Sequence, residues 1–488
     1  MPSSNERSTF DLSQVPGRVG ERRLPRLLYL MIVLLLVQSS RSLYAPALAF
    51  VHCVLIDGTG RPAQRDMTVI VAGGRIVAIG ASTSLPIPHE ILILSAKGRF
   101  LIPGLWDMHV HVQRYPYFYF ALLTANGITG ARDMGGPLED LEHWRDQIAN
   151  REILGPKLFF AGPYLDGPRP LWNPSIAVGD ATTARRAVDD LRRRGADFIK
   201  IQAGLPREAY FAIAEESTIE HIPFAGHVPD SVTVLEASRA GQRSIEHLNG
   251  LLGACSSQTS PVAAQLSRVP AQERYRFLEE YLNNFSETKA EALFAEFRRL
   301  HTWQCPTLVV WSTYAFFGEG EIEKDPRLAW LPAPVRRGWD PGIDLRFRGI
   351  GLREQAIAKR AFVKNLQLVG AMHRAGVPLL AGTDMPSPFC IPGFGLHDEL
   401  RLLVQAGLSP MEALQTATRN PARYLGLESS LGTIELGKIA DLVLLGANPL
   451  DDIRNVNHVE GVMHDGFYLP KTTIEQMLIS LQSRASLE

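Results

Sequence analysis

The chain has 488 residues, of which 45% are hydrophobic and 21% are charged. This is an ordinary balance for a globular protein with a large buried core. Its 50 basic and 51 acidic residues leave a net charge of −1, which argues against a general electrostatic grip on nucleic acid. The length suits one large domain plus a smaller one, because single barrels routinely exceed about 250 residues.

The N-terminal segment has the pattern of an export signal. Several arginines precede an unbroken apolar run, Leu27–Val37. A basic region followed by about 7–15 apolar residues is typical of a signal peptide, and the run is shorter than the roughly 20 residues of a membrane span. Ala47-Leu48-Ala49 offers a small-x-small cleavage site. We interpret residues 1–49 as a signal peptide or membrane anchor. We therefore expect an exported protein (periplasmic or secreted) or a membrane-anchored one, and the alternative is a start codon assigned upstream of the true one.

Short apolar runs near both chain ends predict a small β domain. Four lie early and four late: Phe50–Ile56, Met67–Val71, Arg75–Ile79, Ile91–Leu94, Gly432–Ile434, Ala440–Leu445, Val462–His464 and Phe467–Leu469. Gly73-Gly74 between two of them is a hairpin signal. We expect residues 50–99 and 425–475 to form one β-sandwich built from both termini, followed by a tail over residues 476–488.

The middle of the chain, residues 100–424, alternates strand and helix signals. Eight strands are predicted: Leu101–His111, Thr129–Asp133, Lys157–Ala161, Phe198–Gln202, Pro223–His227, Ser244–His247, Pro306–Val310 and Pro378–Asp384. Helical periodicity lies between them, as in Thr182–Arg194. Eight strands with helical crossovers predict an α/β fold of the (β/α)8 TIM barrel type. Two stretches, 255–300 and 312–350, do not fit the alternation, and we interpret them as insertions on the catalytic face.

The cysteines do not indicate a metal finger or a redox motif. There are four, Cys53, Cys255, Cys305 and Cys390, and none forms a CxxC pair. This spacing excludes zinc fingers and thioredoxin-like motifs. We expect buried small hydrophobic residues rather than disulfides.

A His-x-His pair is the strongest chemical feature. His109 and His111 end an apolar segment that begins with Leu101-Ile102-Pro103-Gly104. Residues two apart on a strand point to the same side, so both imidazoles can chelate one ion. Alone, the pair is weak evidence for a metal site, because two strand histidines can also be structural.

Four further ionisable residues stand at the ends of predicted strands: Lys200, His227, His247 and Asp384. In a barrel those ends converge on the face where catalytic groups are found. Burying such side chains unpaired would be costly, and a shared metal site removes that cost. Asp107 is a candidate for orienting one of the paired histidines.

Lys200 has two interpretations. It is either a barrel lysine paired with an acid or a modified metal ligand. A desolvated lysine has a depressed pKa, so its neutral amine can react with carbon dioxide. The resulting carbamate is anionic and has two oxygens that can bridge two ions.

The chain resembles the amidohydrolase superfamily, in its imidazolonepropionase-like and prolidase-like branch. The matching motifs run from about residue 50 to 470: LIDGTG, VIVAGGRIVAIG, LIPGLWDMHVHV, GITGARDMGG, DFIKIQ, PFAGHVP, RSIEHL, LLAGTDMP and NPARYLGLESSLGTIELGKIADLVLL. The resemblance implies a metal-bearing barrel with a small β-sandwich made from both ends.

The resemblance also implies a set of ligands. His109 and His111 match the first pair, Lys200 matches the bridging carbamylated lysine, and Asp384 matches the proton-shuttling aspartate of the first metal. His227 and His247 match the histidines of the second metal. Two divalent ions are implied, and zinc suits these ligands, although manganese or cobalt are alternatives.

The implied activity is hydrolysis of a carbon–nitrogen amide-like bond by a hydroxide bridging two metal ions. Asp384 and Lys200 are the catalytic candidates. A dipeptide, an N-acyl amino acid and a cyclic amide all remain open as substrates. The alternative is a deaminase or a lactone or ester hydrolase on the same metal site. We expect a small-molecule substrate and no nucleic acid, and the sequence leaves open a membrane tether and a homo-oligomer.

Three residues are weaker candidates for substrate binding. Tyr164 and Trp172 follow the third predicted strand and are candidates for lining the pocket, or else they are exposed aromatic residues on the barrel rim. His397 follows Asp384 closely, and it either contacts substrate or caps the next helix.

Overall fold

The computed structural model describes residues 47–257, 269–340, 344, 347 and 350–485. Most of the predicted signal segment therefore lies outside the described residues. Its last residues do not, because Leu48 and Ala49 already belong to the first strand, β1 (Leu48–Leu55). In the part of the chain that is described, no helix combines the length and the apolar character needed to cross a membrane.

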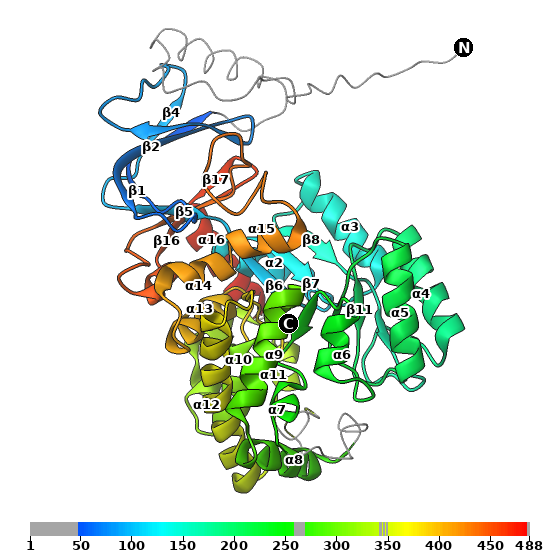
Figure 1. Cartoon of the computed structure of the whole chain (residues 1–488). Helices are drawn as coiled ribbons and strands as arrows, with labels where there is room; N and C mark the ends of the chain where they lie inside the picture. The colour runs from blue at the N-terminus through cyan, green and yellow to red at the C-terminus, as the bar shows by residue number, and fades with distance from the viewer. Residues whose placement is uncertain (1–46, 258–268, 341–343, 345–346, 348–349, 486–488) are drawn as a thin grey trace, which may run out of the picture.

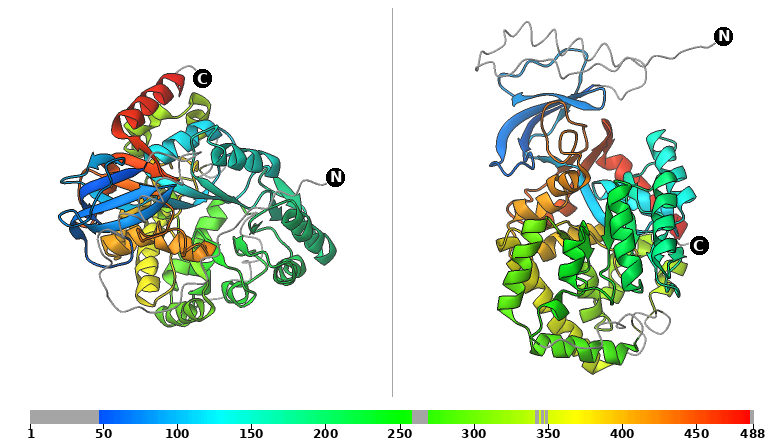
Figure 2. Two further views of the ribbon diagram at one scale, coloured as in Figure 1. Left: turned by 90° about the horizontal axis from the view of Figure 1, so that it is seen from above. Right: turned by 45° about the vertical axis from the view of Figure 1, so that its right-hand side comes forward.

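Strands from both chain ends form one eight-stranded sheet, here called the terminal sheet. Its order is β17-β16-β15-β5-β1-β2-β3, with β4 pairing against β1. The further bounds are β2 (Gln64–Ala72), β3 (Arg75–Ala81), β4 (Leu92–Ser95), β5 (Phe100–Pro103), β15 (Leu442–Leu445), β16 (Val459–His464) and β17 (Phe467–Pro470). The two ends join where β15 pairs antiparallel with β5, Leu444 opposite Leu101. Figures 1 and 2 show this sheet at one end of the molecule.

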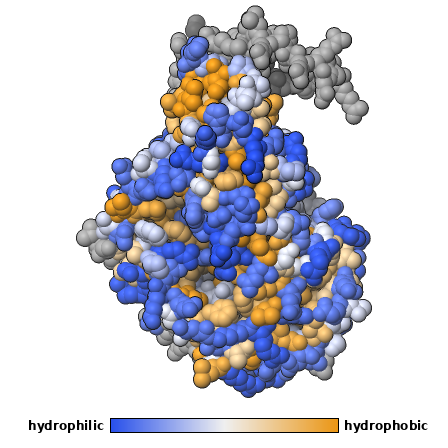
Figure 3. Space-filling view, turned by 90° about the vertical axis from the view of Figure 1, so that its left-hand side faces the viewer, coloured by the Kyte–Doolittle hydropathy of each residue, from blue (hydrophilic) through white to orange (hydrophobic). Residues whose placement is uncertain are grey.

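The surface of the terminal sheet is partly apolar. Figure 3 shows an apolar patch over this end of the molecule. The exposed apolar residues of β4 are Leu92 and Ile93, which are 61% and 58% exposed.

The rest of the chain has a TIM-barrel-like arrangement of parallel strands and helices. One sheet is β6-β7-β8 and another is β10-β9-β11-β12-β13-β14. Their bounds are β6 (Leu105–Val110), β7 (Ile128–Asp133), β8 (Lys157–Phe160), β9 (Tyr164–Asp166), β10 (Ser175–Ala177), β11 (Ile199–Ile201), β12 (Phe224–Gly226), β13 (Ser244–Glu246) and β14 (Trp303–Cys305). Residues 378–385 join the two sheets, since Leu380 N–H donates to Gln304 O and Met108 N–H donates to Ala381 O, both at 2.9 Å.

Helices surround these strands (Figure 1). They are α2 (Pro116–Ala125), α3 (Leu138–Ala149), α4 (Ala181–Arg193), α5 (Arg207–Ile219), α6 (Val234–Arg239), α7 (Leu251–Ala254), α8 (Ala271–Asn283), α9 (Glu287–Leu300), α10 (Leu308–Phe316), α11 (Ala333–Gly338), α12 (Leu352–Arg374), α13 (Phe394–Gln405), α14 (Pro410–Thr416) and α15 (Arg419–Leu425). Helix α4 confirms the predicted helical periodicity: Asp180 caps it by accepting from Thr183 N–H, and Val188 and Leu191 on its inner face are buried. Helices α8 and α12 lie at the end of the molecule opposite the terminal sheet.

Two predicted strands differ in the structure. The segment Leu101–His111 is two strands, because the chain passes at Gly104 from the terminal sheet into the barrel-like part; a Cβ there would lie 2.2 Å from Thr129 Oγ1. The terminal sheet thus extends through Pro103, four residues past the predicted boundary at residue 99. The prediction of a strand at Pro306–Val310 is wrong. Thr307, with a φ of 47°, turns the chain into helix α10, and a short apolar run does not distinguish a buried strand from a buried helix.

The predicted C-terminal tail over residues 476–488 is also wrong for its described part. Helix α16 (Lys471–Ala485) continues through it, with Ile474, Leu481 and Ala485 buried. Ile474 packs with Ala125 of α2 and Val462 of β16. The helix therefore fastens the terminal sheet to the barrel-like part.

The four cysteines are buried and none is in a disulfide, as the sequence predicted.

Candidate active site

The two histidines of the His-x-His pair meet the predicted aspartate. Nε2 of His109 and Nε2 of His111 each lie 3.2 Å from Oδ1 of Asp384. The candidate ligand atoms of these three residues all lie within 4.8 Å of one another. His109 is fully buried, whereas His111 and Asp384 side chains are 18% exposed. One side of the group is therefore open to solvent.

The hydrogen bonds of His109 leave one ring nitrogen aimed at Asp384. Nδ1 of His109 lies 2.9 Å from Oε2 of Glu246. Burial raises the pKa of Glu246, but the Arg132 guanidinium, the hydrogen bond with His109 and the charge of Lys200 together hold that pKa well below its usual range. An ionised carboxylate accepts the Nδ1 proton, so a neutral His109 has its lone pair on Nε2.

This geometry fits a cation. Nε2 of His109 is buried and has no hydrogen-bond partner among the described residues, although it faces the Asp384 carboxylate. Two acceptor atoms facing each other at 3.2 Å repel unless a positive charge lies between them. Imidazole and carboxylate ligands suit divalent transition metals such as zinc.

The other two histidines extend the group. The ring of His247 lies 4.5 Å from that of His109 and 5.1 Å from that of His227, between centroids. Nδ1 of His247 lies 2.8 Å from Thr307 Oγ1, so its other nitrogen remains for a ligand. Burial lowers the pKa of His247 to about 3 and that of His227 well below its usual value. Both imidazoles are therefore neutral, the form that binds metals.

Lys200 lies in the centre of β11, 1% exposed. Burial lowers the pKa of its ammonium to about 8, against the opposing charges of Glu246 and Asp384. Strand β12 lies directly against it, because a Cβ on Gly226 would come within 2.9 Å of Lys200 Cδ. Among the described residues, no carboxylate lies within ion-pair distance of Lys200, so the structure offers no simple pairing partner for a buried ammonium.

The backbone is strained at two of these residues. His247 and Asp384 both have a φ of 59°, a left-handed conformation that costs energy for a residue with a side chain. The segment of Asp384 is held by Asp107, which accepts from Thr383 N–H at 3.0 Å and from Thr383 Oγ1 at 2.6 Å. Asp107 also accepts from the His109 backbone N–H at 3.2 Å. It thus fixes the backbone of both partners rather than an imidazole ring.

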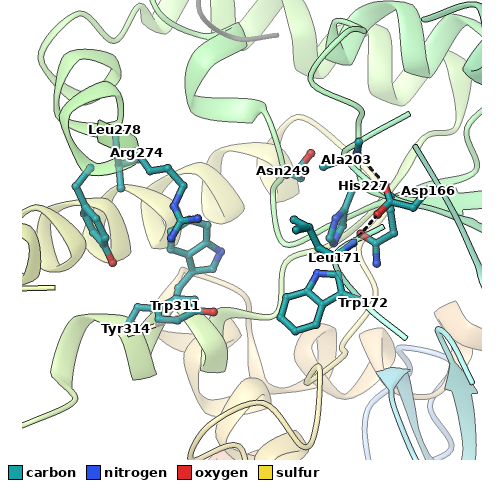
Figure 4. Close-up of a pocket in the computed structure, with 13 residues that line it drawn as sticks. Asp166, Leu171, Trp172, Ala203, His227, Asn249, Arg274, Leu278, Trp311 and Tyr314 are labelled. Carbon is teal, nitrogen blue, oxygen red and sulfur yellow. Dashed lines mark hydrogen bonds between the residues drawn. The ribbon is translucent and has the colours of Figure 1, made fainter. Parts of the chain in front are cut away.

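A cavity of about 410 Å³ opens beside this group. His227 forms part of its wall (Figure 4). The other lining residues are Asp166, Leu171, Trp172, Gln202, Ala203, Gly204, Asn249, Arg274, Tyr275, Leu278, Trp311 and Tyr314. Apolar walls with a few polar groups are typical of small-molecule sites.

The three weaker candidates for substrate binding lie in different places. Trp172 lines the cavity and is 45% exposed. Tyr164 does not line the cavity, but its hydroxyl lies 3.1 Å from Nδ1 of His111. The structure does not bring His397 to the group. Its ring is buried, with Nδ1 2.7 Å from Asn457 Oδ1 and Nε2 2.9 Å from Asn126 O.

The sequence alone did not reveal the partners that hold His109. Arg132 donates from Nη2 to both Glu246 oxygens at 2.9 Å, and from Nη1 to Tyr424 OH at 2.8 Å. Their signal was present, because Arg132 and Glu246 are charges within two of the predicted strands. Such charges are almost never buried unless paired.

Comparisons with known proteins identify relatives that match most of the chain. Residues 341–467 match the amidohydrolase family. An imidazolonepropionase from Rhizorhabdus wittichii is 38% identical over 406 residues, covering 79% of this chain and 90% of that protein. An ochratoxinase from Aspergillus niger is 23% identical over 472 residues, covering 84% and 83%. The solved structure of a bottromycin amidohydrolase, 24% identical, superimposes with a TM-score of 0.74 and covers 93% of each chain.

The fold and the relatives define a hydrolase that acts on carbon–nitrogen bonds. The chain belongs to the amidohydrolase family. Enzymes of this family generally use divalent metal ions, and His109, His111 and Asp384 are a group that could hold one.

Proposed function

We propose that this protein is a binuclear metal-dependent hydrolase that cleaves an amide-like bond of a small molecule. In this proposal parallel strands of the two sheets, together with residues 378–385, form a (β/α)8 barrel within residues 100–424, and the terminal sheet folds on itself into a β-sandwich. The observation that carries it is the shared distance of 3.2 Å from Asp384 Oδ1 to Nε2 of both His109 and His111.

Six side chains would hold the two ions, which we expect to be zinc. His109, His111 and Asp384 would bind the first, His227 and His247 would bind the second, and Lys200 would bridge them as a carbamate. The depressed pKa of Lys200, about 8, supports the last step. Its neutral amine adds to carbon dioxide and loses one proton, which gives a two-oxygen anion where a buried ammonium had no partner. When bound, the two ions would polarise the substrate carbonyl and lower the pKa of water to about 7.

In this proposal Asp384 would move the proton. Its Oδ2 accepts from Ser387 Oγ at 2.7 Å, which fixes the carboxylate plane. The opposing effects of burial and of the neighbouring histidines leave the pKa of Asp384 well below its usual range, so it is ionised and can accept a proton. It would then deliver that proton to the leaving nitrogen.

The N-terminal segment supports a proposal on location. We propose that residues 1–49 direct export or anchor the protein in a membrane, because basic residues precede the apolar run Leu27–Val37. Cell fractionation of the full chain, with N-terminal sequencing of the product, tests this. Recovery of the uncut chain in the cytosol would contradict it.

The central experiment is a hydrolysis screen with zinc-loaded enzyme over N-acyl amino acids, dipeptides and cyclic amides. We expect release of a free amine from at least one class, and loss of that activity in Asp384→Asn. Release of ammonia, or cleavage of lactones or esters alone, would replace the amide proposal with a deaminase or an ester hydrolase on the same site.

A further inference from the structure

The walls of the cavity beside His227 are dominated by aromatic side chains. Trp172 comes from the loop between β9 and β10, and Trp311 and Tyr314 come from α10. Trp172 is 45% exposed. Leu171 beside it is 60% exposed and lines the same cavity. An apolar patch at a cavity rim is typical of a surface that a ligand covers, because its burial against an apolar group is favourable.

The two indoles are held in place. Trp311 Nε1–H donates to the backbone oxygen of His247 at 3.1 Å, which connects its ring to one of the candidate metal ligands. The loop that carries Trp172 is held by Asp166, whose Oδ2 accepts from Leu171 N–H at 3.3 Å. Aromatic walls that are fixed before binding lose little entropy when a ligand arrives.

Two charged side chains in the cavity wall, Asp166 and Arg274, differ in their partners. The Asp166 carboxylate already accepts hydrogen bonds from the backbone. Its Oδ1 accepts from Gly167 N–H at 2.8 Å and from Gly204 N–H at 3.0 Å. Arg274 of α8 has no carboxylate within ion-pair distance among the described residues. Arg276, two residues further along the same helix, shows the contrast: it pairs with Glu280 at 3.3 Å, outside the cavity. Arg274 is thus a cation in the cavity wall that no described acid balances.

Arg274 lies away from the candidate metal ligands. Figure 4 shows its side chain extending from α8 toward Trp311, on the side of the cavity opposite His227. A guanidinium binds a carboxylate through two parallel hydrogen bonds. An anionic group bound there would be separated from the reacting bond by the width of the cavity.

We propose that the substrate has an aromatic or large apolar body, held among Trp172, Trp311 and Tyr314, and a carboxylate remote from the scissile bond that pairs with Arg274. This assignment rests on the proposed hydrolase for the identity of the site. It makes Arg274 the residue that determines specificity for anionic substrates.

Binding of ligands that are not hydrolysed tests the assignment independently of turnover. The ligands are 4-phenylbutanoate, the neutral alcohol 4-phenylbutan-1-ol, which has no bond to hydrolyse, and butanoate, titrated by calorimetry into the zinc-loaded protein. The variants are Arg274→Met and Arg274→Lys. Arg276→Met is the matched control, because it removes the same charge from the same helix outside the cavity. Arg274→Gln serves as a second neutral variant if the methionine variant does not fold.

For the wild type and Arg276→Met, we expect 4-phenylbutanoate to bind at least about tenfold more tightly than the neutral alcohol, as for a charge-assisted hydrogen bond. Arg274→Met reduces this preference to within about twofold, and Arg274→Lys keeps part of it. Butanoate binds more weakly than 4-phenylbutanoate, because it lacks the aromatic body.

Three results would overturn the assignment: no preference for the acid in the wild type, a preference that survives in Arg274→Met, or equal binding of butanoate and 4-phenylbutanoate. A preference for the acid that survives in Arg274→Met would mean that the carboxylate binds at the candidate metal ligands instead. Failure of the hydrolysis screen leaves these comparisons intact, so the two proposals fail separately.

Discussion

Oε2 of Glu246 lies 2.9 Å from Nδ1 of His109, and both side chains are fully buried. Arg132 contacts the same carboxylate with two hydrogen bonds of 2.9 Å. The carboxylate therefore fixes which ring nitrogen of His109 carries the proton, and the guanidinium keeps the carboxylate ionised.

Replacing Glu246 by Gln should weaken metal binding. The amide no longer holds the His109 proton on Nδ1 as firmly, and loss of such a partner typically costs about 10–100-fold in metal affinity. Competition with a chromophoric zinc chelator measures this. The variant also leaves Arg132 without its charge partner, so its thermal unfolding temperature should fall.

The double variant Arg132→Met/Glu246→Gln separates these two effects. Removing both charges should restore part of the stability while the zinc affinity stays low. Recovery of full zinc affinity would show that Glu246 acts only through stability.

Replacing Asp384 by Asn should remove the proton carrier. We expect kcat to fall by at least about 10²-fold, the lower range for a general acid–base, with much of the bound metal retained because an oxygen ligand remains. Ser387→Ala, which removes the hydrogen bond of 2.7 Å to Oδ2, should have a smaller effect on kcat. An Asp384→Asn variant with the kcat of the wild type would exclude Asp384 as the proton carrier.

The buried carboxyl of Glu399 predicts a pH dependence of stability. Burial raises the pKa of Glu399 from its ordinary value of 4.5 to about 8. The folded protein then keeps a proton that the unfolded chain releases between these values, so the free energy of unfolding falls as the pH rises from about 5 to 8.

Glu399→Gln should remove this contribution, because the amide does not titrate. Its unfolding temperature should exceed that of the wild type at pH 8, with a smaller difference at pH 5. The exposed Glu428→Gln is the control and should follow the wild type. A pH profile of Glu399→Gln parallel to that of the wild type would contradict the assignment of the proton.

His397 should be a structural residue. Both its ring nitrogens are engaged, with Asn457 Oδ1 at 2.7 Å and Asn126 O at 2.9 Å. His397→Ala should lower the free energy of unfolding by about 2–3 kcal/mol, since two buried hydrogen bonds are lost, and leave KM and bound zinc unchanged. A large change in KM without loss of stability would return His397 to the substrate site.

The site was predictable from the sequence where its residues stand at strand ends. His109, His111 and Asp384 each follow an apolar run, and the topology of parallel strands brings such ends together. The supporting residues were harder to find. Glu246 contacts Arg132 across 114 positions of sequence, and no local pattern encodes that separation.

For the fold too, local sequence patterns predicted some elements, whereas others depend on contacts between distant residues. Short apolar runs at both chain ends predicted a small β domain built from both termini, and the pairing of β15 with β5 joins those ends in one sheet. The run at Pro306–Val310 was misassigned because apolar composition is shared by buried strands and helices, and the turn at Thr307 depends on a tertiary contact. Val309 N–H donates to Glu399 at 2.8 Å, far along the chain. The C-terminal helix α16 was missed because its buried stripe is narrow, with three buried residues.

Metal content is the most direct test of the central claim that six side chains hold two ions. Elemental analysis of the wild type and Lys200→Ala, both purified after growth with zinc and freed of excess metal, measures it. The account predicts about two zinc ions per wild-type chain and a clear loss of metal and turnover in Lys200→Ala. A wild type with well under one ion per chain, or a Lys200→Ala variant that retains two ions and full activity, would contradict it.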